Sequence, residues 1–283
     1  MGQTGLSKSR ELSKKPDNWG TSPNVDNVTL VADLRGRNLR YANMKSTFVV
    51  KGDFRDAQLD GTNLCSSDLR KADFTRAYGR DAMFCDAQLG GMRGTWIDLV
   101  GSNLQRAHLE NAYLVDANLA KTNFEWAHLN GASLTNADLK ESHLEAAHFD
   151  HADLKGINLV GANLTQSHLD GADLSGARLM GARLSEASLV GTDITDANLS
   201  GADLSGVDFT RLRLSPINRL RSMSAMPTGL ASATLDGAIY SIGRRPTVFP
   251  KGFYPRPNTM FRVDDKGELL TVKPKIRGEH SKN

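Results

Sequence analysis

The chain has 283 residues, of which 39% are hydrophobic, 6% aromatic and 24% charged, and its formal net charge is +3. No window approaches about eighteen consecutive apolar residues, which argues against a membrane-spanning helix. Residues 1–29 contain no apolar segment of the kind found in a standard secretory signal. The two cysteines cannot form a disulfide framework, and no Cys-x-x-Cys zinc pattern is present. These features predict a cytoplasmic protein without a membrane span.

The pattern along the chain predicts four segments. Residues 1–29 lie outside any repeat and are expected to form an N-terminal tail and cap. Residues 30–214 form one continuous repeat region. Residues 215–263 are expected to form a C-terminal repeat, shifted out of frame, and a cap, because Ala238-Ile239-Tyr240 restarts the pattern one residue out of phase. Residues 264–283 are polar and basic, and we expect a flexible tail.

The repeat has a period of five residues. Of the 37 positions at every fifth residue from Leu34 to Leu214, 32 are Leu or Phe. Two residues before each of these positions, 32 of 37 residues are small, and 22 of those are Ala. On an α-helix this spacing scatters the leucines around the axis, and on a straight strand it places them on alternate faces. The period is consistent with a chain that turns a corner every five residues and directs each Ala and Leu pair into one narrow interior.

Units such as Ala172-Asp173-Leu174-Ser175-Gly176 resemble the A-[D/N]-L-x-x motif of the pentapeptide-repeat family. The resemblance covers about two-thirds of the chain. It implies an all-β fold, a right-handed quadrilateral parallel β-helix with four pentapeptides in each coil. The spacing of like residues supports this 20-residue period independently, and 37 units then correspond to about nine coils.

The region with the most regular repeat is predicted to supply the centre of the core. Gly79 and Gly94 interrupt the large positions, and Met92 at a small position suggests that large and small core residues are exchanged locally. A bend at this point is the alternative. The predicted core residues are Leu104, Leu109, Leu114, Leu119, Phe124, Leu129, Leu134, Leu139, Leu144, Phe149, Leu154, Leu159, Leu164, Leu169 and Leu174.

Four histidines occupy one outward position on consecutive coils, at His108, His128, His148 and His168. Ladders of like side chains stack well in any solenoid, so the structural interpretation is preferred and no cofactor is expected. Neighbouring imidazoles are alternatively metal ligands or a pH sensor. Cys65 and Cys85 are also 20 residues apart, at a Cα spacing compatible with a disulfide. In a reducing cytoplasm we expect free thiols.

No Walker loop, Gly-x-Ser-x-Gly, metalloprotease or Rossmann motif is present, so we do not expect an enzyme. Residues 81–214 carry 9 basic and 18 acidic side chains, which predicts an acidic rod. We therefore expect a scaffold or display surface for a protein partner. The predicted interaction residues are Glu110, Glu125, Trp126, Glu141, Glu145, Asp150 and Asp170.

Two alternatives to a general scaffold stay open. The family resemblance implies that such a rod can resemble duplex DNA, bind bacterial DNA gyrase or a related topoisomerase, and protect it from fluoroquinolones. A secreted effector or a virion-associated structural protein is the second alternative. Direct nucleic-acid binding through the basic tail is not expected, and a homodimer through one coil end is a further possibility.

Overall fold

The computed structural model describes residues 25–28, 31–212, 233, 235, 238–241, 246–249 and 260–264. Residues 1–24 of the expected N-terminal tail and cap, and the basic tail after residue 264, lie outside the described residues. The regular elements are two 3-10 helices, η1 (Val25–Asn27) and η2 (Phe209–Arg211), and two strands, β1 (Ala238–Ser241) and β2 (Met260–Val263). No helix in the described part of the chain has the length and apolar character needed to cross a membrane.

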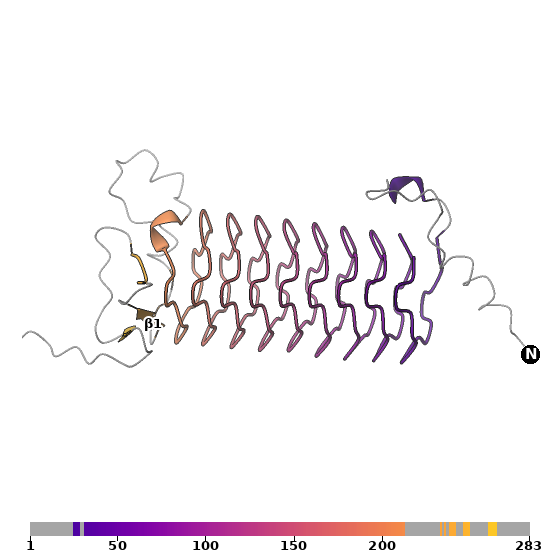
Figure 1. Ribbon diagram of the computed structural model, residues 1–283, viewed down its shortest axis with the longest axis horizontal. Coiled ribbons are helices and arrows are strands. Elements are labelled where there is room, and N and C mark those ends of the chain that lie inside the picture. The colour runs from indigo at the N-terminus through magenta and orange to yellow at the C-terminus, as the bar shows by residue number, and fades with distance from the viewer. Residues whose placement is uncertain are drawn as a thin grey trace, which may run out of the picture.

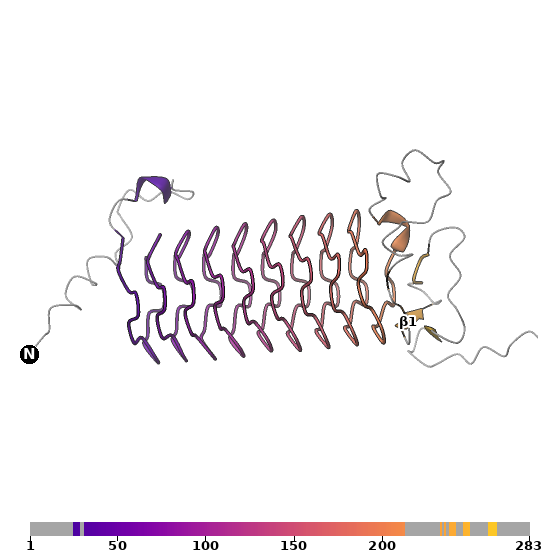
Figure 2. The same ribbon diagram turned by 180° about the vertical axis from the view of Figure 1, so that it is seen from behind.

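Residues 31–212 form a β-solenoid in which successive turns of chain stack along one axis (Figure 1). Parallel bridges join residues 20 apart in an unbroken series, from Asp33 with Asp53 to Arg183 with Asp203. The view from behind shows the same straight stack of turns (Figure 2). We call a set of residues that are 20 apart a column, because they lie side by side on one face.

The backbone hydrogen bonds explain why the repeat prefers Asp or Asn before each Leu. In the unit that begins at Ala32, the N–H groups of Leu34 and Gly36 donate to carbonyls of the next turn at 2.8 Å. The N–H group between them, that of Arg35, donates to the side-chain oxygen of Asp33 at 3.2 Å. The same bond recurs where the N–H of Arg40 donates to Asn38 Oδ1, and at many later units. A short side chain with an oxygen therefore satisfies the donor that the neighbouring turn does not reach.

Each corner is a tight turn with one residue in the left-handed region. The first residue after each corner donates its N–H back to the carbonyl of the preceding Leu, as Arg37 does to Leu34 at 3.1 Å. The second corner residue has positive φ at every corner from Gly36 (φ 59°) to Gly206 (φ 76°). Positive φ at this position is the mark of a type II turn. Four such corners in each 20 residues give the coil four sides.

The interior is a continuous column of large and small apolar residues. The fifteen predicted core residues from Leu104 to Leu174 are each 1% exposed or less. Phe54 and Phe74 stack with ring centroids 4.4 Å apart, one turn above the other. Several buried hydroxyls at small positions donate to backbone carbonyls, as Thr122 Oγ1 does to Leu99 at 2.8 Å, whereas Ser167 Oγ has no hydrogen-bond partner among the described residues.

The two glycines at large positions cause a local change in packing and no interruption of the stack. A Cβ atom at Gly94 would lie 2.9 Å from both Met92 Cε and Leu114 Cδ2, so these side chains fill the missing volume. At Gly79, Leu99 Cδ2 takes the equivalent place. A small apolar cavity of about 10 Å³ remains beside Met92 and Ile97. The exchange of large and small core residues is thus present, and the turns continue straight through it (Figure 1).

Segments outside the repeat pair with both ends of the rod. Lys51 Nζ donates to the carbonyl oxygen of Asp26 at 2.9 Å, which holds η1 beside the first turns. At the other end Ile239 in β1 pairs with Asp203, and Val248 pairs with Asp208. Strand β1 pairs in parallel with β2. Ala238 is fully buried, which extends the alternation of the core by one small residue.

Candidate interaction face

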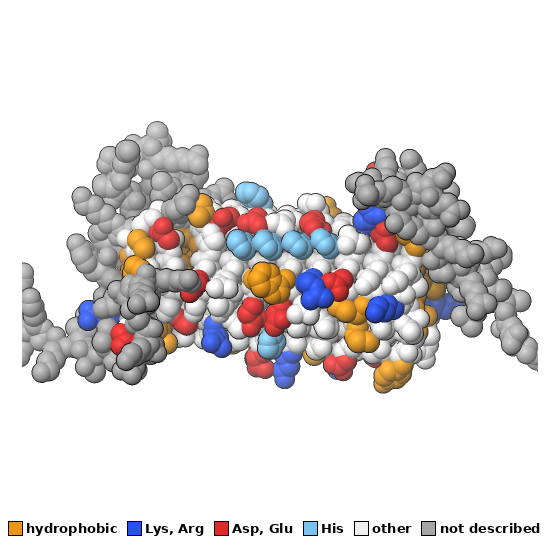
Figure 3. Space-filling model, viewed as in Figure 1, with side chains coloured by type: hydrophobic (Ala, Val, Ile, Leu, Met, Phe, Trp, Pro, Cys, Tyr) orange, Lys and Arg blue, Asp and Glu red, His pale blue; other side chains and the backbone are white. Residues whose placement is uncertain are grey.

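The most distinctive surface of the rod is one side of four consecutive turns, which we call the histidine face. It comprises the column His108, His128, His148 and His168, the adjacent column Glu110, Asn130, Asp150 and Asp170, and the corner residue Trp126. The row of histidines runs along the rod, with carboxylates on both sides of it (Figure 3). Parallel bridges from residue 88 through 108, 128, 148 and 168 to 188 fix this alignment.

The four imidazoles form a parallel stack. Ring centroids are 4.8 Å apart for His108 and His128, 5.0 Å for His128 and His148, and 4.5 Å for His148 and His168. The interplanar angles are 10° or less. The spacing of the coils therefore sets the spacing of the rings, and each ring is in van der Waals contact with its neighbour.

Carboxylates in the adjacent column face the ring nitrogens. His108 Nδ1 lies 3.0 Å from Glu110 Oε1, and His148 Nδ1 lies 3.8 Å from Asp150 Oδ2. Burial lowers the pKa of His148, and the neighbouring rings of His168 and His128 lower it further, while Asp150 acts in the opposite direction. The environment of His148 therefore favours its neutral form.

The histidines do not make the side-chain bond that Asp and Asn make at the same position of the repeat. Asn103 Oδ1 accepts from the N–H of Gln105 at 2.9 Å, whereas His108 directs Nδ1 at Glu110 Oε1. The backbone N–H groups of Glu110, Asn130, Asp150 and Asp170 have no such bond among the described residues. Four consecutive turns thus lack a local hydrogen bond that Asp and Asn make at many other units, and hold stacked imidazoles at this position.

Trp126 occupies the corner next to the histidine column. It has φ of 60° and is 56% exposed, an unusual environment for an indole. Ala146, at the next corner of the same edge, is only 5% exposed, because its neighbours there, Trp126 and Gln166, are larger. More than half of the Trp126 side chain is therefore accessible to a partner.

A second group of titratable side chains lies on the other side of the same corner. One donor atom from each of Glu125, His143 and Glu145 lies within 4.8 Å of the other two. Glu125 Oε2 accepts from Gln105 Nε2 at 2.9 Å, and Glu145 Oε1 accepts from Asn163 Nδ2. This is the one group of three or more His, Cys, Asp or Glu side chains among the described residues with donor atoms this close.

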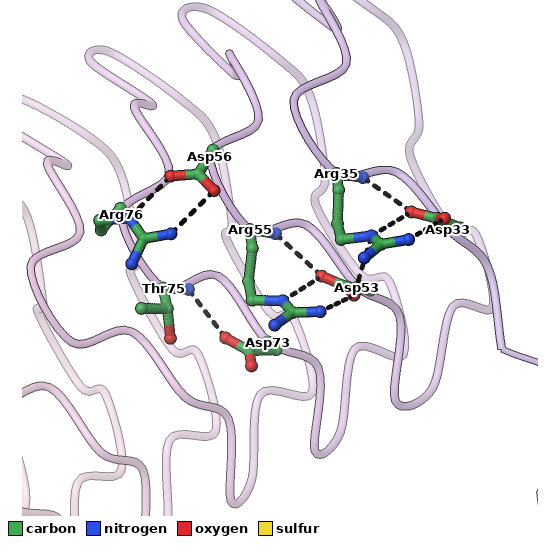
Figure 4. Close-up of polar contacts among 8 residues, drawn as sticks. All are labelled: Asp33, Arg35, Asp53, Arg55, Asp56, Asp73, Thr75 and Arg76. Carbon is green, nitrogen blue, oxygen red and sulfur yellow. Dashed lines mark hydrogen bonds and ion pairs between the residues drawn. The ribbon is translucent and has the colours of Figure 1, made fainter.

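A different face of the first turns carries ion pairs in place of free charges (Figure 4). Arg35 contacts Asp33 at 2.7 Å and Asp53 at 3.4 Å, and Arg55 contacts Asp53 at 2.6 Å. These hydrogen bonds from Arg35 and Arg55 lower the pKa values of the two carboxyl groups. The aspartate column at this end of the rod is therefore largely neutralised by arginines.

The predicted interaction residues divide between three corners of the coil. Glu110, Asp150 and Asp170 lie on the histidine face, and Glu125, Trp126 and Glu145 lie at its corner. Glu141 lies at another corner, where Lys121 and Lys140 approach it at 3.7 Å and 3.3 Å. His143 was not among the predicted residues. Its spacing from Glu145 by two and from Glu125 by 18 was the signal that could have found it.

The expectation of free thiols is wrong for this structure, because Cys65 and Cys85 form a disulfide. Stacking on consecutive turns places their Cα atoms 4.6 Å apart, within the range of natural disulfides. The expectation depended on a reducing compartment, which the residues themselves do not determine.

Comparison with known proteins identifies the family. A model of pentapeptide repeats matches the chain in eight copies, over residues 57–91 and in overlapping segments over residues 97–211. The chain therefore belongs to the pentapeptide-repeat family. No curated protein sequence matches it significantly.

Solved structures of the same family resemble the rod. HetL from the cyanobacterium Nostoc sp. strain PCC 7120, described as involved in heterocyst differentiation regulation, is 29% identical, with a TM-score of 0.64. That match covers 73% of this chain and 88% of HetL. QnrB1, described as a plasmid-mediated fluoroquinolone resistance protein, is 18% identical over 69% of this chain and 91% of its own, with a TM-score of 0.39.

Proposed function

We propose that the protein is a non-catalytic scaffold that presents its histidine face to a protein partner. The observation that carries the proposal is the loss of the Asp or Asn hydrogen bond on four consecutive turns in favour of a stacked row of imidazoles. A fold that needed only stability would keep the shorter side chain at these positions. An exposed indole beside this row adds the kind of aromatic anchor that is enriched in protein interfaces.

The chemistry of the face indicates the chemistry of the partner. Between His108 and Gly171 the outward positions of this face hold three carboxylates, Glu110, Asp150 and Asp170, and no Lys or Arg. The rod core is filled with Leu, Phe and Ala, and its small cavity beside Met92 is apolar, so recognition takes place on the outer surface. A partner with a basic patch and a pocket for an indole would complement this surface.

The DNA-mimic alternative receives less support from the contacts. Mimicry of duplex phosphates requires a line of uncompensated carboxylates. Arg35 and Arg55 pair with Asp33 and Asp53, and Lys155 Nζ lies 3.3 Å from Asp173. A supercoiling assay with purified gyrase, with and without a fluoroquinolone, tests this alternative, and inhibition or drug protection by the protein would support it.

Site-specific photocrosslinking tests the proposal directly. A photoreactive phenylalanine analogue replaces Trp126 in one variant and Asn136 in a matched control. Both are exposed corner residues, ten residues apart along one coil, with φ of 60° and 58°, and their columns lie on different edges of the rod. Crosslinking in the organism that encodes the protein should give a defined adduct from position 126 and none from position 136. Equal adducts at both positions, or none at 126, would contradict the proposal.

A further inference from the structure

Glu125, His143 and Glu145 converge although they come from different turns. Glu125 and Glu145 share a column and so project from consecutive turns, and His143 lies two residues before Glu145 on the same face. The donor atoms of the three side chains lie within 4.8 Å of one another. Two carboxylates and one imidazole are thus gathered at the edge of the rod beside Trp126.

The group is incomplete as it stands. Glu145 Oε1 accepts a hydrogen bond from Asn163, but Glu145 Oε2 is buried and has no hydrogen-bond partner. A buried carboxylate oxygen without a partner is costly, because it loses its hydration without compensation. Within the described coils no Lys or Arg forms an ion pair with Glu125 or Glu145. Arg106, on the adjacent turn, is held by Asp86 at 2.7 Å.

The sequence also shows a substitution at this point. His143 stands in a column of asparagines, with Asn103, Asn123 and Asn163 as its neighbours. Asn123 and Asn163 each accept a hydrogen bond from the backbone N–H two residues later, at 2.8 Å and 3.2 Å. His143 therefore stands in place of an Asn next to Glu125 and Glu145, the two glutamates that share a column on consecutive turns.

We propose that Glu125, His143 and Glu145 form a binding site for a divalent transition-metal ion of the Zn²⁺ type. Imidazole nitrogens and carboxylate oxygens are both ligands of Zn²⁺, and three protein ligands leave one of four tetrahedral positions open. Tetrahedral coordination at bonds of about 2.0–2.2 Å places ligand atoms about 3.3 Å apart, so the present group must contract. His143 allows this, because its side chain is 59% exposed and its Nδ1 already lies 4.0 Å from Glu145 Oε1.

The histidine ladder does not offer an equivalent site. Its rings are parallel and 4.5–5.0 Å apart, so equivalent nitrogens of neighbouring rings are separated by about the same distance. Two nitrogens bound to one Zn²⁺ ion at about 2.1 Å cannot be more than about 4.2 Å apart. The ladder would have to unstack to share an ion, whereas in the corner cluster His143 Nδ1 already lies 4.0 Å from Glu145 Oε1, within this limit, and its exposed side chain has room to move. This assignment does not depend on the proposed partner.

Calorimetric titration of the untagged full chain with ZnCl₂ at neutral pH tests the assignment. We expect one ion bound per chain. His143→Asn restores the residue type of its column, and Glu145→Gln matches Gln105 in its own column, so both variants should fold. Each should weaken Zn²⁺ binding at least tenfold. The control His168→Asn removes an imidazole from the ladder and should bind Zn²⁺ as the wild type does.

Thermal melting gives a second measurement on the same proteins. A saturating excess of Zn²⁺ should raise the Tm of the wild type and of His168→Asn, because the ion binds the folded state. It should leave the Tm of His143→Asn unchanged. The absence of wild-type binding at about 100 μM Zn²⁺, where even weak sites are occupied, would overturn the assignment. Undiminished binding in His143→Asn and Glu145→Gln, or loss of binding in His168→Asn, would also overturn it. If either site variant fails to melt cooperatively, Glu125→Gln replaces it in the same comparison.

Discussion

Acid should weaken the rod through the histidine ladder between pH 7.5 and 5.5. Burial and the adjacent rings lower the pKa of His148 below its ordinary value of 6.5. The unfolded chain therefore takes up protons as the pH falls through about 6.5, while the folded chain resists them, and stability decreases towards acid pH. Above that pH His148 is neutral in both the folded and the unfolded state and contributes no pH dependence.

The stacking distances give the size of the effect. Two unit charges about 4.8 Å apart repel by about 0.9 kcal/mol in bulk water, so the two pairs that His148 forms with His128 and His168 amount to about 1.7 kcal/mol. Screening at physiological ionic strength reduces this to about 1 kcal/mol. For a folded unit of this size, that corresponds to a decrease in Tm of about 2–4 °C. Asp150, which faces His148, reduces the effect, and the outward positions of this face hold no lysine or arginine between His108 and Gly171.

Thermal melts followed by circular dichroism at pH 7.5 and 5.5 provide the assay. The double variant His128→Asn/His148→Asn leaves no two adjacent ladder histidines, and each Asn can restore the side-chain bond to the following backbone N–H. Its Tm should change less with pH than that of the wild type. Its Tm at pH 7.5 should be higher, since a restored hydrogen bond contributes about 0.5–1.5 kcal/mol. His143→Asn, outside the ladder, is the control and should follow the wild type. An equal decrease in Tm for the wild type and the double variant would refute the reasoning.

Three further predictions concern the rod itself. Leu139→Ala should lower the free energy of unfolding by about 2–5 kcal/mol in a denaturant titration, because truncating a fully buried Leu leaves a cavity. Leu139→Arg should prevent folding, because it buries a charge without a partner. An unchanged denaturation midpoint for Leu139→Ala would contradict this prediction. Gly176→Ala should cost about 1 kcal/mol through its φ of 68° alone, since a Cβ there meets no atom within 4 Å, and a stabilised variant would contradict the turn assignment. Reduction of the Cys65–Cys85 disulfide should lower the free energy of unfolding by about 3 kcal/mol, the value for a 20-residue loop. Reductant should therefore lower the Tm of the wild type and leave the Tm of a Cys65→Ser/Cys85→Ser variant unchanged.

The period of the sequence carries most of the information on the fold. Leu at every fifth position and Ala two residues earlier determine which side chains point inward, and the bridges from Asp33 to Asp203 follow the predicted 20-residue spacing. The same spacing predicted that His108 to His168 lie side by side. These inferences succeed because each turn contacts only its neighbours, so that one local rule determines the whole stack.

The remaining features depend on side-chain geometry, which the period does not describe. The rings of the ladder stack, and His108 and His148 face carboxylates. Predicting these contacts requires the side-chain rotamers as well as the positions of the residues. The disulfide depends on redox conditions that the sequence does not specify. Glu145 Oε2 has no hydrogen-bond partner, while Glu145 Oε1 accepts from Asn163. No pattern of residue types in the sequence indicates which of the two oxygens is bonded.

The most direct test of the account is the affinity of the crosslinked partner for two alanine variants. Trp126→Ala removes the exposed indole at the edge of the histidine face, and Asn136→Ala changes a corner on another edge. If the histidine face is the interaction surface, Trp126→Ala should weaken binding at least tenfold, or about 1.4 kcal/mol, and Asn136→Ala should leave it unchanged. Full affinity in Trp126→Ala, with both variants folded, would contradict the assignment of this face.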